Sequence, residues 1–316
     1  MSDAKDFYRK NHWKDSPVFH QPWWLDAVSG DHWDVALIKR EHELAAYYLY
    51  AYRKDGFGLH LTMPYLTQFL GPNYVLSGKN TRERNNEEMN ILELLLNQLP
   101  RVQSFESRWQ FKFQNWLPFY WSGYQQRTRY TYLLENISNA NSLRENFSEK
   151  IEREISKANR QFRIEEATDV SEFWALLLKN FHNKRLRIPF GESFLAALLT
   201  ASIENQSGKI LLAKNDSGAV AAGIFVVWDA NTAYYIIGGK NDDFGNSGAM
   251  SLLFWNTFAE LSTNVSTFDF EGSMIKGVEN YFRSFGAARH GFFEITKIHS
   301  PLLKIKSGFK SLFDKK

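Results

Sequence analysis

Apolar and polar positions follow two periods along the chain, and together they predict a mixture of strands and helices. An apolar stripe at helical spacing over 87–99, which stops at Pro100, predicts a helix. Three segments rich in aromatic and β-branched residues predict an antiparallel meander at 33–38, 44–53 and 58–63. Further strands are expected near 102–105, 111–113 and 128–134.

The second half of the chain predicts the element order α-α-α-β-β-β-α-β-α-β. Its expected helices are 142–161, 171–181, 192–203, 248–261 and 277–285, and its expected strands are 209–214, 219–228, 232–238, 267–270 and 290–298. An Asn- and Ser-rich stretch at 137–143 separates the two halves. We therefore predict an α+β protein of two domains, residues 1–136 and 137–299, in which helices flank mixed, mostly antiparallel sheets.

The tail 300–316 is apolar as well as basic, with six lysines within 297–316. It is expected to pack back on the first domain as a short helix. Its basic face also suits an anionic membrane surface or a lipid-linked precursor, so peripheral membrane contact stays open.

Composition narrows the functional classes. The chain of 316 residues has a net charge of +3, far below that of a dedicated nucleic-acid binder, so no DNA partner is expected and an anion site must be local. The absence of cysteine excludes disulfides and thiolate catalysis, and no pair of histidines has metal-ligand spacing, so no metal is predicted. No apolar run is long enough to cross a membrane and no signal sequence is recognised, which predicts a cytoplasmic protein.

The first candidate site follows the buried strand near 267–270. Asp269, Glu271 and Ser273 stand at the end of this strand, and the next helix carries Phe282 and Arg283 near its end. Polar groups at a sheet edge often contact ligands, so Glu271 is a candidate general acid or base. Alternatively, the two carboxylates cap loops and pair with neighbouring cations.

The second candidate is the loop between the strand ending at Gly238 and the helix beginning at Gly248. Gly245, Ser247, Gly248 and Ala249 leave loose backbone before a helix, whose N–H groups suit a phosphate or a carboxylate. A flexible loop with a capped helix is the alternative.

The third candidate is a cluster of cations at a helix end. Lys184, Arg185 and Arg187 could hold a diphosphate, since guanidinium groups offer paired donors. The same cations also complement the negative end of the helix that precedes them, and could simply face solvent.

Four blocks of the sequence, in their order and spacing, resemble the Fem family of peptidoglycan-bridge aminoacyltransferases. These blocks are 131–134, 147–158, 173–178 and 268–286. The resemblance implies two GNAT-like domains in tandem, the fold of acyl-CoA N-acyltransferases. It also implies transfer of an amino acid from aminoacyl-tRNA to the stem peptide of a cell-wall precursor.

The resemblance also suggests roles for single residues. It places the family's Phe-Lys pair at Phe282 and Arg283, and implies that Arg283 stabilises developing negative charge while Glu271 removes a proton. It further implies substrate contacts for Arg185, Tyr235 and Trp24. The lysine that the family uses for the precursor's diphosphate is replaced by the segment 26–29, so a uridine-diphosphate precursor is not implied.

Three functions follow as hypotheses. The first is a Fem-type acyl or aminoacyl transferase acting on an amine of a cell-envelope precursor, with aminoacyl-tRNA or acyl-CoA as donor. The second is an acyl-CoA-dependent N-acetyltransferase, which needs free helix N–H groups in the loop 240–249. The third is a non-catalytic module whose aromatic residues, 16% of the chain, line a groove for a glycan or a peptide.

Overall fold

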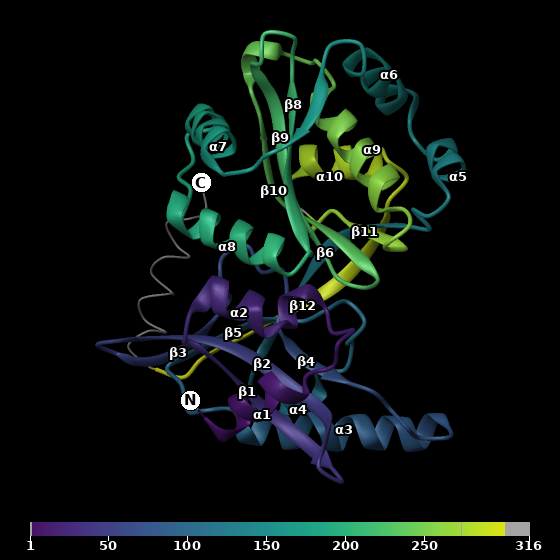
Figure 1. Ribbon diagram of the computed structural model, residues 1–316. Coiled ribbons are helices and arrows are strands. Elements are labelled where there is room, and N and C mark those ends of the chain that lie inside the picture. The colour runs from purple at the N-terminus through teal and green to yellow at the C-terminus, as the bar shows by residue number, and fades with distance from the viewer. Residues whose placement is uncertain (1, 273, 301–316) are drawn as a thin grey trace. The chain divides into compact units, whose positions relative to one another are not determined.

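The computed structural model describes residues 2–272 and 274–300, and these divide into two compact units (Figure 1). Unit 1 comprises the N-terminal residues up to Lys14, Ser29–Arg129, and the described residues from Gly291 onward. Unit 2 comprises Asp15–Val28 and Tyr130–His290. Both units have helices packed on a sheet, which confirms the predicted α+β class.

Unit 1 contains a mostly antiparallel sheet in which β1, β2, β3, β5 and β12 are neighbours in this order and β4 also pairs with β2. Its elements are α1 (Asp3–Asn11), β1 (Trp33–Arg40), β2 (Glu43–Asp55), β3 (Gly58–Thr62), β4 (Gly71–Tyr74), α3 (Thr81–Gln98), β5 (Ser104–Arg108), α4 (Leu117–Trp121), the part of β6 (Gln125–Glu135) up to Arg129, and the part of β12 (Ala288–Ile298) from Gly291 onward. The helix α3 packs against β1, β2 and β4. Leu92 and Leu95 on this helix are fully buried, together with Trp109 and Phe119, in an aromatic-rich core.

In unit 2 the neighbouring strands follow the order β6, β11, β10, β9, β8, β7. Its elements are η1 (Val18–His20), α2 (Pro22–Ser29), α5 (Ala140–Glu145), α6 (Glu149–Ala158), β7 (Arg163–Glu166), α7 (Ser171–Asn183), α8 (Glu192–Glu204), β8 (Gly208–Lys214), β9 (Val220–Trp228), β10 (Thr232–Lys240), η2 (Asp242–Phe244), α9 (Ala249–Leu261), β11 (Thr267–Asp269) and α10 (Lys276–Arg283). Only β10 and β11 run parallel among these paired strands.

Helices cover both faces of the central strands of unit 2. The helices α7 and α8 lie on one side of β8, β9 and β10, and α9 lies on the other, next to α6 and α10 (Figure 1). Because both faces are covered, β8 and β9 are buried along nearly their whole length and have apolar side chains on both faces. This packing holds β10 rigidly between the two helical layers.

The segment Asp15–Val28 belongs to unit 2 through the buried carboxylate of Asp229. That carboxylate accepts hydrogen bonds from the Val18 N–H at 3.1 Å, from the Thr232 N–H at 3.0 Å and from the Tyr234 hydroxyl at 3.0 Å. Phe19 packs edge-on against Tyr234. The contact division therefore differs from the expected boundaries 1–136 and 137–299, since residues 15–28 pack with the second half.

The structure corrects several expected elements. The single helix expected over 142–161 is two helices, because the Ser148 side chain accepts the Ile151 N–H and caps the start of α6. Residues 111–113 do not form a strand. The expected packing of the tail falls almost entirely on residues 301–316, which lie outside the described residues. No helix within 2–272 and 274–300 is long and apolar enough to span a membrane.

The docking of Asp15–Val28 gives a first prediction. Asp229→Ala leaves three donors, the Val18 and Thr232 N–H groups and the Tyr234 hydroxyl, without their acceptor, so the free energy of unfolding should fall by about 3 kcal/mol. Chemical denaturation would measure the loss, with Asp216→Ala as the control because the Asp216 side chain is 89% exposed. Equal stability of the two variants would contradict this role of Asp229.

Candidate functional site

A cavity of about 420 Å³ opens in unit 2 where two neighbouring strands part. The strand β10 pairs with β11 only over Thr232–Tyr234, and then continues alone on that side to Lys240. Its register with β9 also shifts between Tyr235 and Ile237, which marks a bulge. Tyr235, Gly238, Gly239 and Lys240 on the free part of β10 line the cavity, and α6, α7, α9 and α10 supply most of the other walls.

The N-terminus of α9 faces this cavity without a side-chain cap. Gly248 occupies the cap position with φ +81°, and Ala249, Met250 and Ser251 of the first turn all line the cavity. A helix leaves its first N–H groups without intrahelical acceptors, and the aligned peptide dipoles make this end positive. The closest side-chain partner is the Ser247 hydroxyl, 3.4 Å from the Ala249 nitrogen. This wall of the cavity therefore favours an anionic group.

Gly248 also lets α9 start directly against α6. A Cβ atom at this position would overlap the backbone carbonyl oxygen of Glu154, and the left-handed φ disfavours any other residue. The glycine thus places the first turn of α9 beside Glu154.

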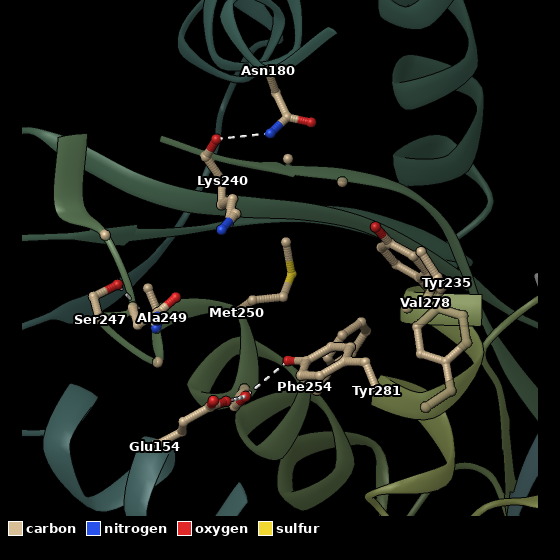
Figure 2. A pocket seen from close by; sticks show the side chains of 18 of the residues that line it. Glu154, Asn180, Tyr235, Lys240, Ser247, Ala249, Met250, Phe254, Val278 and Tyr281 are labelled. Carbon is tan, nitrogen blue, oxygen red and sulfur yellow. Dashed lines mark hydrogen bonds between the residues drawn. The ribbon is translucent and has the colours of Figure 1, made fainter. Parts of the chain in front are cut away.

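Lysines surround the cavity. Lys184 donates to the Asn180 side-chain oxygen at 2.9 Å, and burial lowers the pKa of its ammonium group. The Asn180 amide donates to the Lys240 carbonyl at 2.9 Å, so Asn180 links α7 to β10 (Figure 2). Lys240 lies 3.6 Å from Asp242, and Lys150 lies 3.8 Å from Glu154. Together with the start of α9, these lysines provide positive charge on several sides of the space.

A chain of three hydrogen-bonded side chains lines the cavity beside the first turn of α9. The Ser251 hydroxyl is 2.6 Å from a Glu154 carboxylate oxygen and 2.8 Å from the Tyr281 hydroxyl. Figure 2 shows the Tyr281 hydroxyl turned toward Glu154, with Phe254 and Val278 nearby. Burial raises the pKa of both Tyr281 and Tyr235 above the ordinary value for a phenol, so both side chains stay protonated at neutral pH.

The structure brings seven of the sequence-predicted residues into this one cavity. They come from the second and third candidate groups and from the resemblance, and they are Gly245, Ser247, Gly248, Ala249, Lys184, Tyr235 and Phe282. The loop and the lysine, which are about 60 residues apart in the sequence, meet because α7 packs against β10.

Other predicted residues do not line the cavity. Asp269 is buried and accepts hydrogen bonds from the Thr131 hydroxyl and from the Glu271 N–H, and its substrate-binding role stays a prediction. Trp24 is fully buried against Phe19, which corrects its expected contact with substrate. Ser273 lies outside the described residues.

The predicted catalytic pair is also placed outside the cavity lining. The Arg283 side chain is 61% exposed and donates to Glu279 and Asn280 on its own helix. Glu271 adopts a left-handed backbone with φ +56° and lies near enough to Tyr235 to raise its pKa. Arg185 and Arg187 are exposed in the loop after α7. Catalytic roles for Glu271 and Arg283 stay predictions.

Sequence reasoning missed Glu154, Ser251 and Tyr281. Each lies within a segment that was recognised as a helix, but Ser251 and Tyr281 are far apart in the sequence and no motif joins them. Glu154 lies in a helix whose many charges are typical of a solvated face. Within residues 2–272 and 274–300, no group of three or more histidines and carboxylates has the arrangement of a metal site.

Comparisons with known proteins agree with this geometry. The model of the GNAT acetyltransferase domain matches residues 144–283, which include nearly all of the cavity wall, and it identifies unit 2 as an acyltransferase domain. No curated protein is similar in sequence to this chain.

Solved structures show the fold of the chain as a whole. The crystal structure of FemX is similar with a TM-score of 0.63 and 12% identity, over 92% of this chain and 94% of that one. L-PGS from Bacillus licheniformis is similar with a TM-score of 0.54 and 12% identity, over 96% and 93%. A tandem GNAT protein of the clavulanic acid biosynthesis pathway gives 0.53 and 9%, over 85% and 83%. The chain therefore has a tandem GNAT-like, FemABX-type fold, as the resemblance implied.

The close approach at Gly248 gives a second prediction. Gly248→Ala should lower the free energy of unfolding by about 2–4 kcal/mol, because it combines left-handed strain with overlap against α6. Gly245→Ala is the matched control, since it also has a positive φ but meets no atom within 4 Å. Thermal or chemical denaturation would compare them, and equal losses would show that contact with α6 does not constrain α9.

Proposed function

We propose that this chain is an N-acyltransferase that moves an acyl or aminoacyl group from a phosphate-bearing donor to an amine of a cell-envelope precursor. The observation that carries the proposal is the uncapped N-terminus of α9, which opens into a cavity surrounded by Lys150, Lys184 and Lys240. Phosphate groups suit both the free N–H groups and the lysines. The match of residues 144–283 to an acetyltransferase domain supports the transfer chemistry.

The reaction requires little from the protein beyond positioning. An amine attacks the donor's acyl carbon, a C–N bond forms, the C–S or C–O bond to the donor breaks, and the amine loses one proton. Holding donor and acceptor together removes much of the entropic barrier, and fixed dipoles stabilise the oxyanion. The free edge of β10 and the start of α9 provide such dipoles beside the cavity.

The acceptor class rests on the fold relatives. FemX gives the highest TM-score among the structures compared above, and a domain of a putative lysylphosphatidylglycerol synthetase from Agrobacterium fabrum is similar with a TM-score of 0.55. The second name refers to a membrane lipid, and the Fem family that the sequence resembles acts on a cell-wall precursor, so both support a cell-envelope precursor as the acceptor class. An amine matches the chemistry of Fem-type transfer that the sequence resemblance implies.

Acyl-CoA is the donor favoured by the local geometry. An acyl-CoA enzyme needs backbone N–H groups that are available to a phosphate in the loop before α9. The cap position of α9 is occupied by Gly248, so the cap residue itself provides no side-chain hydrogen bond to them. The name of the solved tandem GNAT structure mentions AcCoA, and says that this structure was determined without it. Aminoacyl-tRNA is the second donor, supported by the resemblance to the Fem family.

Calorimetric titration of the whole chain separates these donors. Acetyl-CoA and longer acyl-CoAs are titrated in one series and a mixture of charged tRNAs in another. Micromolar binding of an acyl-CoA identifies an acyl-CoA N-acyltransferase, and tRNA binding without CoA binding identifies the aminoacyl route. Binding of neither donor contradicts the proposal and favours a non-catalytic module that holds a glycan or a peptide.

The cavity lysines give a third prediction. Lys240→Ala should weaken donor binding about tenfold, as expected for the loss of one charge-assisted contact to a phosphate, and the effect should shrink as salt is added. Arg163→Ala on β7 is the control, because its side chain is 81% exposed and pairs with Asp216 outside the cavity. Unchanged donor affinity in Lys240→Ala would exclude this lysine from the donor site.

A further inference from the structure

The three side chains Glu154, Ser251 and Tyr281, here called the hydroxyl chain, connect the cavity to a carboxylate through two hydroxyl groups. They come from three different helices, α6, α9 and α10, and all three line the cavity. Ser251 is almost fully buried, and the Glu154 side chain is 22% exposed. The two distances, 2.6 Å and 2.8 Å, are those of good O–H···O hydrogen bonds.

Counting protons gives the hydroxyl chain a direction. An ionised carboxylate only accepts hydrogen bonds, so the single Ser251 proton is donated to Glu154. Ser251 has no second proton, and must therefore accept in its contact with Tyr281. The Tyr281 proton thus points at Ser251. What the phenol oxygen offers to the cavity is a lone pair.

We propose that the hydroxyl chain is a proton relay that accepts a proton from the attacking amine, with Tyr281 as the group that touches the amine. The inference rests on the proposed function, since it names a step of that transfer. Ser251 and Glu154 act through Tyr281 as positioning residues. The cavity wall here therefore selects an acceptor that can donate an N–H hydrogen bond.

The step balances without a tyrosinate. Before the attack, one proton of the ammonium form of the amine passes to the Tyr281 oxygen, which frees the nitrogen lone pair. The Tyr281 proton passes to Ser251 and the Ser251 proton passes to Glu154, so the net change is one proton moved from the amine to the carboxylate. After the C–N bond has formed and the bond to the donor has broken, the second proton goes to the thiol or hydroxyl group that leaves. The raised pKa of Tyr281 agrees with a phenol that passes a proton on rather than losing it to solvent.

Two further contacts hold the hydroxyl chain in place. The close approach of α9 to α6 occurs at Gly248. Ser251 follows about one turn further along α9, within hydrogen-bond distance of Glu154. The Lys150 ammonium group lies 3.8 Å from the Glu154 carboxylate, so an ion pair fixes the other end of that side chain. Phe254 lies beside Tyr281, with ring centroids 6.2 Å apart, and packs against the phenol ring.

The test compares two acceptor amines that differ in protonation. Ethanolamine is an ammonium ion at neutral pH and must lose a proton to react, whereas methoxyamine is already neutral and needs less help. Acetyl-CoA is the donor probe, or the charged tRNA mixture if the titration shows that tRNA binds instead. The rate of acyl transfer is measured for the wild type, Tyr281→Phe, Ser251→Ala and Glu154→Gln.

We expect each of the three variants to lose about 10²-fold or more in transfer to ethanolamine, and about threefold or less in transfer to methoxyamine. Ser251→Ala is the most informative variant, because it interrupts the hydroxyl chain while Tyr281 and Glu154 both remain. Glu149→Gln on the same helix is the control, with a side chain that is 94% exposed, and should match the wild type with both amines. Donor affinity by calorimetry verifies that each variant keeps its cavity.

Two results would count against the relay, and they differ from failure of the proposed function. An active wild type whose variants lose the same factor with both amines shows a merely structural role, and overturns the relay while the transferase assignment stands. Variants with unchanged rates overturn it as well. A wild type that transfers nothing from either donor contradicts the proposed function, and the relay with it.

Discussion

The parting of β10 from β11 is the constraint on which the rest of the site depends. After Tyr234 the two strands no longer pair, so the space that a continuous ladder would close becomes a cavity. The helices α7 and α9, packed on opposite faces, hold β10 in place while it runs on to Lys240. The unpaired backbone edge of β10 therefore borders the cavity, and the two helices hold this strand in place. Precise positioning of a substrate requires such a fixed element.

The start of α9 gives the cavity its charge and its chemistry at once. With glycine at the cap position and only the Ser247 hydroxyl near the Ala249 N–H, the first turn of the helix lines the cavity, where the proposed phosphate group would meet it. The same glycine lets α9 approach α6 so closely that Ser251 reaches Glu154. Donor binding and proton transfer are therefore assigned to the two sides of one helical turn, and one residue change would disturb both.

Fold and function are supported at different levels. Residues 144–283 are an acyltransferase domain by sequence model, and the whole chain shares the tandem GNAT-like fold of FemX at 12% identity. Such low identity carries the architecture and not the substrate. The proposals rest instead on local features of the cavity: the lysines that line it, the aromatic wall of Phe254 and Phe282, and the hydroxyl chain that ends at Glu154.

The sequence by itself determined the α+β class, most helices and strands of the second half, and the glycine loop before α9, because periodicity and turn residues act locally. It also indicated Lys184 and Tyr235, which the fold brings to the same cavity. Only the tertiary structure decided that Trp24 and Asp269 are interior residues and that Arg283 faces solvent. It alone joined Glu154, Ser251 and Tyr281, because hydrogen bonds between three separate helices depend on packing that no local pattern encodes.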